Sequence, residues 1–165
     1  MAVKLNGFKR PTAIFLSNKH FFIRIKGELM DAKVIWKNKM SFDGTSDSGF
    51  VVPLGTDPEL GGDNDGFRPL ELFAIGLGGC TGMDVVSILA KKKQKIHTFE
   101  VKVHVDKSTD HPKVFTKVEV EYIVSGEDID RAAVERAVEL SVTKYCPAQA
   151  MLSKSVPITH KITIK

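Results

Sequence analysis

The stretch that decides the fold is RPLELFAIGLGGCTGMDVVSIL, residues 68–89, which is apolar apart from a few charges. The proline near its start suits the first turn of a helix. Glu71 lies in that turn, where the helix dipole favours a negative charge, and the lysines of residues 91–93 lie at the far end, where it favours positive charge. We therefore predict one long helix from Pro69 to Lys93.

This helix is apolar on nearly every side, which is typical of a helix inside a protein. Asp84 lies deep within the apolar run, where a carboxylate in a bilayer would be costly, so we expect no membrane association. Small residues allow a second backbone to approach, and they predict a central helix packed against another helix. The glycines concerned are Gly76, Gly78, Gly79 and Gly82.

Strands are predicted before this helix. His20–Lys26 and Ala32–Trp36 have the composition of strands, and in the second the apolar side chains alternate as in a half-buried strand. Residues 43–66 are rich in glycine and aspartate and are predicted to form a loop with one short strand, Phe50–Leu54. Pro53 lacks a backbone N–H and confines that strand to a sheet edge.

After the helix, alternation predicts two strands, Phe99–Val105 and Val114–Val124, joined by the turn STDHP as an antiparallel hairpin. A second helix, Ile129–Tyr145, follows with Asp128 as its N-cap. A short helix over residues 147–152 and a last strand over residues 157–165 complete the chain. Strands, helix, hairpin, helix and strand in this order indicate the α+β class.

The composition argues against several classes of function. A chain of 165 residues fits one domain, and a net charge of +4 is too small for the basic stripe of a nucleic-acid-binding protein. The five histidines form no metal-binding spacing, so we expect no metal site. The N-terminal stretch has no uninterrupted apolar segment of signal-peptide length, and the expected location is cytoplasmic.

The chain has two cysteines, Cys80 and Cys146, which lie 66 residues apart. This spacing fits neither a CxxC motif nor a four-ligand zinc site. The thiols are either inert core residues or a redox pair that the fold brings together. Asp84 shares a helix face with Cys80 and would raise a thiol pKa unless a cation intervenes, so we expect it to cap, to bridge or to meet a partner. Pro147 would place Cys146 at a helix N-cap, where N–H groups and the dipole stabilise a thiolate.

Two cysteine motifs resemble those of the osmotically inducible protein C / organic hydroperoxide resistance (OsmC/Ohr) family. The first is the helical stretch at residues 68–89, and the second is KYCPAQAML, residues 144–152, where proline follows cysteine after a helix. The spacing of the cysteines matches the family, and AKVIWKNKMSFDG, residues 32–44, resembles its opening strand pair. The likeness covers residues 31–165 as one domain, and residues 1–30 form an N-terminal extension that could add an edge strand.

The motif GGCTGMD, residues 78–84, is most similar to the less characterised OsmC-like branch of that family. The resemblance implies an intertwined homodimer with long central helices wrapped by antiparallel sheets. It also implies a peroxidase in which Cys80 attacks a hydroperoxide, becomes a sulfenic acid and is resolved by Cys146 as a disulfide. An external dithiol would then regenerate the thiols, and the resemblance implies that no metal or organic cofactor is required. These implications make the protein part of an oxidative stress response.

The family's hydroperoxide reductases pair the reactive thiolate with an arginine, and the matching stretch here offers only Lys37 and Lys39. Arg24 and Arg68 are possible substitutes. Glu71 either reaches the site or only begins the helix. The alternative function is a non-peroxidatic dimer that binds a small apolar or reactive molecule at its interface.

Overall fold

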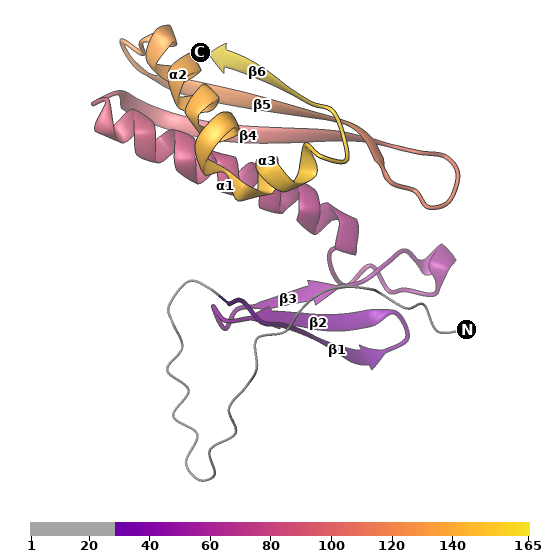
Figure 1. Cartoon of the computed structure of the whole chain (residues 1–165). Helices are drawn as coiled ribbons and strands as arrows, with labels where there is room; N and C mark the ends of the chain where they lie inside the picture. Colours follow the sequence, from indigo (N-terminus) through magenta and orange to yellow (C-terminus); the bar gives the residue numbers. More distant parts are fainter. Residues whose placement is uncertain (1–28) are drawn as a thin grey trace, which may run out of the picture.

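The computed structural model describes residues 29–165, so the predicted strand His20–Lys26 and most of the N-terminal extension lie outside the described residues. Two three-stranded sheets are joined through one long helix. The smaller sheet, which has the shorter strands and is formed by residues 32–54, lies apart from the helices (Figure 1). Along the chain the elements are β1 (Ala32–Asn38), β2 (Ser41–Ser46), β3 (Val51–Leu54), a 3-10 turn (Pro58–Leu60), α1 (Pro69–Lys91), β4 (Lys95–Lys107), β5 (Phe115–Glu127), α2 (Arg131–Leu140), a π-helical turn (Ser141–Tyr145), α3 (Pro147–Leu152) and β6 (Ile158–Ile164). The predicted α+β class is confirmed.

The central helix α1 begins at Pro69 as predicted. The Glu71 carboxylate accepts a hydrogen bond of 3.0 Å from the Arg68 backbone N–H, which satisfies a donor at the helix start. The helix ends at Lys91, slightly before the predicted end, because Lys93 has left-handed backbone geometry with φ 57°. By length and composition α1 could cross a membrane, but one of its faces is packed into the protein core.

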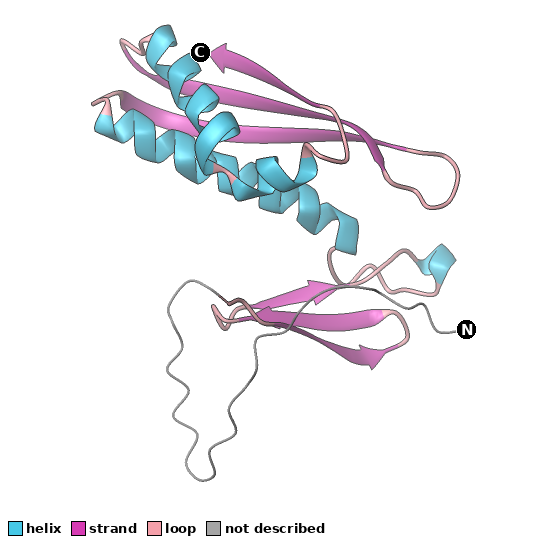
Figure 2. Ribbon diagram, viewed as in Figure 1, coloured by secondary structure: helices cyan, strands magenta, loops and turns pink. Residues whose placement is uncertain are grey.

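The larger sheet has the order β4-β5-β6, and α1, α2 and α3 cover one of its faces (Figure 2). The hairpin of β4 and β5 is antiparallel as predicted, whereas β6 pairs with β5 in parallel, because the chain crosses over through α2 and α3. The fully buried core fills the space between helices and sheet. Its largest members are Leu77, Val85, Leu89, Val118, Val120, Tyr122, Val124 and Val134.

The helix glycines do not pack as expected. A Cβ added at Gly78 would lie 3.1 Å from a Val103 methyl group, and one at Gly82 would lie 3.4 Å from Val101, so these glycines allow α1 to approach β4 rather than a second helix. Gly76 and Gly79 face open space within the described part of the chain. The second helix, α2, packs on a different face of α1.

The segment predicted as one helix over Ile129–Tyr145 is divided. Regular α-helix runs over Arg131–Leu140, and the next turn is π-helical. The N-cap is Asp130, whose carboxylate accepts a 2.9 Å hydrogen bond from Ala132 N–H. The predicted cap, Asp128, is wrong, because its backbone has a φ of 48° and forms the preceding turn. The short third helix, α3, is confirmed.

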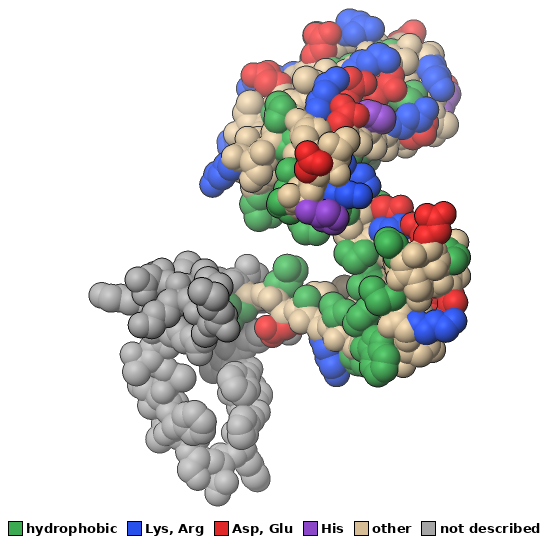
Figure 3. Space-filling view, turned by 90° about the vertical axis from the view of Figure 1, so that its right-hand side faces the viewer, with side chains coloured by type: hydrophobic (Ala, Val, Ile, Leu, Met, Phe, Trp, Pro, Cys, Tyr) green, Lys and Arg blue, Asp and Glu red, His purple; other side chains and the backbone are tan. Residues whose placement is uncertain are grey.

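In the smaller sheet, β2 lies between β1 and β3, and β3 is an edge strand as Pro53 requires. The predicted loop begins later than expected, because residues 43–46 belong to β2 and pair with its neighbours. Every residue of β1 is exposed in a single chain, so the prediction that this strand is half-buried is wrong there. Hydrophobic side chains are gathered on the surface of this part of the molecule, among them Trp36, which is 63% exposed (Figure 3).

Candidate functional site

The fold brings Cys80 and Cys146 together, although 66 residues separate them. Cys80 lies in the middle of α1 on the side that packs against α3, and Cys146 is the residue immediately before α3. Both are free thiols; Cys80 is half-buried, and Cys146 is 2% exposed. The Cys80 side chain interacts directly with the Cys146 thiol, and the two sulfurs are the centre of the candidate site.

Cys146 is the N-cap of α3, as its neighbour Pro147 predicts. Its Sγ accepts a 3.3 Å hydrogen bond from Gln149 N–H, and its own backbone N–H donates a 2.9 Å hydrogen bond to the Ser141 carbonyl. The π-helical turn therefore ends on the cysteine and fixes its backbone. Sulfur and main chain are held by different elements, which restricts the thiol to one position against α1.

The N-cap hydrogen bond lowers the pKa of Cys146 as expected, but other effects outweigh it. The pKa of this thiol is raised to about 11, mainly by burial and also by the neighbouring Cys80 and Asp84, and only the hydrogen bond from Gln149 opposes the rise. A helix of one and a half turns offers too little stabilisation to offset the loss of water around the sulfur. Cys146 is therefore a neutral thiol at pH 7.

A chain of buried hydrogen bonds runs beside the two thiols and links four elements. Asp84 Oδ2 accepts from Ser141 Oγ at 2.9 Å, and Ser141 Oγ lies 2.9 Å from Thr81 Oγ1. Thr81 Oγ1 lies 2.8 Å from the Tyr122 hydroxyl, which lies 3.3 Å from Nδ1 of His160. Thr81, Ser141 and Tyr122 are buried in the core.

The direction of these bonds follows from the carboxylate end, because an ionised carboxylate can only accept. Ser141 donates to Asp84, so Thr81 must donate to Ser141 and Tyr122 to Thr81. Tyr122 then accepts from His160, which assigns the Nδ1–H form to a neutral imidazole. Burial lowers the pKa of His160 and favours that neutral form. The buried Nε2 of His160 has no hydrogen-bond partner among residues 29–165.

The positive side chains considered for thiol activation are engaged elsewhere. Within the described residues each is paired with a carboxylate away from the cysteines. The pairs are Lys37 with Asp43, Lys39 with Asp63, and Arg68 with Asp57. Arg24 lies outside the described residues. The same part of the chain contains no cluster of three or more His, Cys, Asp or Glu side chains that could hold a metal.

Glu71 is placed by the structure in the first turn of α1, where it caps the helix through Arg68. Nine residues separate it from Cys80, a rise of about 13 Å along a helix axis. Within a single chain it therefore has a structural partner, and a role at the thiols stays a prediction.

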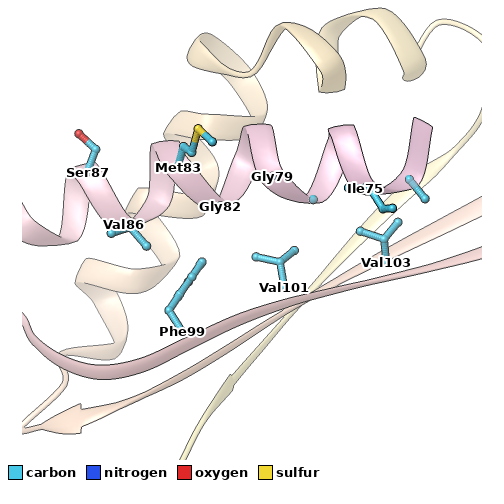
Figure 4. Close-up of a pocket in the computed structure, with 11 residues that line it drawn as sticks. Ile75, Gly79, Gly82, Met83, Val86, Ser87, Phe99, Val101 and Val103 are labelled. Atoms are coloured by element: carbon cyan, nitrogen blue, oxygen red, sulfur yellow. The ribbon is translucent and has the colours of Figure 1, made fainter. Parts of the chain in front are cut away.

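A groove of about 840 Å³ opens between α1 and β4 (Figure 4). Its lining includes Gly79, Gly82 and Met83 of the helix and Val101 of the strand, and Met83 is 77% exposed. The lining is almost entirely apolar. This groove lies on the face of α1 that is not covered by α2 or α3.

Raising the pH above 9 is expected to destabilise the fold. The folded state favours the neutral forms of Cys146, with a pKa raised to about 11, and of Tyr122, with a pKa raised to about 12 by burial, while the unfolded chain loses these protons nearer pH 9 and 10. The stabilisation is thus complete below pH 9 and is lost as the pH rises through the folded values. Urea unfolding should show that the free energy of unfolding falls between pH 8 and pH 10.5 in both proteins. The fall should be smaller in Cys146→Ser than in the wild type, by roughly 1–2 kcal/mol. Equal losses in the two proteins would contradict the assignment.

Sequence reasoning missed three members of the buried chain, Thr81, Tyr122 and Ser141. The available signals were weak: a threonine next to the cysteine, a tyrosine on the apolar face of a strand, and a serine in the apolar stripe of a helix. A polar residue at a buried position needs a partner. Asp84 was expected to bridge, and its hydrogen bond with Ser141 agrees with that expectation.

Comparison with known proteins gives a consistent result. Residues 62–161 match the family model described as OsmC-like protein. Protein YhfA of Escherichia coli K12 is 38% identical over 138 residues, which are 82% of this chain and 98% of that protein. A crystal structure of a hypothetical protein from Aquifex aeolicus VF5 is 27% identical, with a TM-score of 0.74, and the alignment covers 84% of this chain and 97% of that one. An organic hydroperoxide resistance protein from Elizabethkingia anophelis has the same fold, with a TM-score of 0.65, 18% identity and coverage of 86% and 100%.

Proposed function

Because this chain belongs to the OsmC-like protein family, we propose that it is a thiol-dependent peroxidase that reduces organic or small hydroperoxides. The observation that carries the proposal is the meeting of Cys80 and Cys146, since these are the two cysteines of the chain and the fold brings them side by side as free thiols. Several structures with this fold are named as hydroperoxide resistance proteins, which supports the same chemistry.

The reaction would proceed in two steps. The Cys80 thiolate attacks the terminal peroxide oxygen, the O–O bond breaks, and the departing alkoxide takes a proton to leave as an alcohol. Cys80 is then a sulfenic acid. The Cys146 sulfur attacks the Cys80 sulfur, the S–O bond breaks, and the Cys146 proton and the hydroxide leave as water. An external dithiol reduces the resulting disulfide by exchange and restores both thiols.

The different surroundings of the thiols support this order. Cys80 is half-buried on α1, so a small peroxide can approach it, whereas Cys146 is almost fully buried and neutral at pH 7. A neutral thiol is a poor nucleophile toward peroxide. It can still react with a sulfenic acid formed beside it, because the two sulfurs start as neighbours.

The working unit in this proposal is an intertwined homodimer. One face of α1 forms an apolar groove, and the apolar side chains of β1 are exposed, including Val34 and Trp36. Exposed apolar surfaces of this extent are typical of protein interfaces. A second copy that covers both surfaces would place the long helices at the centre and the smaller sheets around them. We expect this dimer in the cytoplasm, where dithiol reductants are present.

The second candidate is a non-peroxidatic dimer that binds a small apolar or reactive molecule at the interface. Two observations favour it. The groove along α1 is apolar, and Lys37, Lys39 and Arg68 are paired with carboxylates rather than with Cys80. A thiolate without a nearby cation is less populated at neutral pH.

Thiol titration distinguishes the two candidates. The reduced protein, kept anaerobic, is treated with one equivalent of cumene hydroperoxide, and the free thiols are counted with time. We expect two thiols per chain to fall to none, with one alcohol formed per chain. If both thiols persist for hours, the peroxidase proposal is wrong, and the protein should be screened for a ligand in the groove.

A further inference from the structure

Asp84 links the helix that carries Cys80 to the turn that carries Cys146. It lies four residues after Cys80 on the same face of α1, and its Oδ2 accepts a 2.9 Å hydrogen bond from the Ser141 hydroxyl. The carbonyl of the same serine accepts the backbone N–H of Cys146 at 2.9 Å. One residue, Ser141, thus joins the carboxylate on the helix of the first thiol to the backbone of the second.

We propose that Asp84 is a positioning residue for the thiol pair, which fixes the turn carrying Cys146 through Ser141 and so keeps the second sulfur beside Cys80. The inference rests on the proposed two-step function and adds to it the residue that holds the second thiol in place for the second step. Asp84 does not touch the peroxide in this scheme.

The hydrogen-bond chain holds the carboxylate in place. Thr81 donates to Ser141 and Tyr122 donates to Thr81, so the hydroxyl hydrogens all point toward Asp84. Reversing any one of them would leave a buried donor or acceptor without a partner, which is costly. The Ser141 side chain is fully buried, and its hydrogen bond with Asp84 is partly buried.

The charged and titratable groups that face Asp84 come from several elements. Cys80 and Lys91 lie on its own helix, and Lys91 and Tyr145 line a small hollow with the carboxylate. Cys146 at the start of α3 and Tyr122 of β5 both have a pKa raised by the Asp84 charge, after the larger effect of burial. Lys91 is the one cation lining that hollow, and it is exposed.

The placement has a chemical consequence. Once Cys80 carries the hydroxyl group, the Cys146 sulfur held beside it attacks the Cys80 sulfur, and the Cys146 proton leaves with that hydroxyl as water. A turn that did not hold Cys146 in place would slow this step without changing the attack of Cys80 on the peroxide.

The test measures Cys146 without any peroxide. In Cys80→Ser the chain retains a single cysteine, so a sample labelled with ¹³C at cysteine Cβ gives one signal that follows ionisation of Cys146. We expect its midpoint to lie a few tenths of a pH unit lower in Cys80→Ser/Asp84→Asn than in Cys80→Ser, roughly a twofold change in thiolate at a given pH. Asparagine keeps the size of the side chain and an oxygen that can accept from Ser141.

Two controls separate charge from position. Glu135→Gln removes a carboxylate that is exposed on α2 and should leave the midpoint unchanged. Ser141→Ala keeps the Asp84 charge but removes the bridge, so it should slow disulfide formation between the thiols with diamide while the midpoint shifts less than in Asp84→Asn. Unchanged rates of disulfide formation with diamide in both Ser141→Ala and Asp84→Ala would overturn the inference, whether or not the wild-type protein reduces hydroperoxides. Inertness of the wild type toward peroxide, with those rates slowed, would overturn only the proposed function.

Discussion

Replacing Cys80 by serine is expected to lower the rate of cumene hydroperoxide reduction by roughly a thousandfold or more, because the serine hydroxyl does not ionise at neutral pH and cannot form a sulfenic acid. Replacing Cys146 is expected to act differently. The first step should proceed at nearly the wild-type rate in Cys146→Ser, and the product should be a sulfenic acid on Cys80 that accumulates instead of a disulfide.

Mass spectrometry after a dimedone trap gives the necessary readout, since the sulfenic acid adds the reagent at a single cysteine. Wild-type protein treated in the same way should show a mass loss of two hydrogens and little adduct. Circular dichroism spectra that match the wild type would show that each variant is folded. If Cys80→Ser still consumed hydroperoxide while Cys146→Ser did not, the roles of the two thiols would be reversed.

The sequence was sufficient to predict the scaffold of this site. The apolar run at residues 68–89 predicted a central helix with Cys80 in it, and Pro147 predicted that Cys146 begins another helix. Local patterns suffice for such features because helix starts depend on a few neighbouring residues. The alternation in β4 and β5 was equally informative, since those strands have one face on the core and one in water.

Features that depend on distant contacts were not predictable in this way. The pKa of Cys146 is set by burial and by Cys80 and Asp84, which outweigh the local effect of the N-cap. The hydrogen-bond chain joins residues up to 60 positions apart, such as Thr81 and Ser141. The parallel pairing of β6 depends on the crossover through α2 and α3. Each of these requires the tertiary arrangement, whereas the sequence pattern reports only the neighbourhood of each residue.

The exposed face of α1 decides whether one chain is sufficient for function. Phe73, Ile75 and Met83 are 56%, 52% and 77% exposed on a helix that would ordinarily be buried on most sides. The strand β1 repeats the pattern, with alternate apolar side chains all in solvent. Removing such surfaces from water stabilises an assembly by about 25 cal/mol per Å² of apolar area buried. A symmetric dimer would bury each surface twice.

Met83→Glu is therefore expected to dissociate the dimer. In a two-fold interface the change introduces two carboxylates into an apolar groove, and their desolvation should weaken association at least a hundredfold, or about 3 kcal/mol. Sedimentation velocity over a concentration series should give a mass near twice 18.2 kDa for the wild type and near 18.2 kDa for the variant. Met151→Glu, the same change at a residue that is 65% exposed on α3 and outside the groove, should retain the larger mass. A monomeric wild type, or a dimeric Met83→Glu, would mean that the groove is not a contact between copies, and it would favour the small-molecule alternative for this surface.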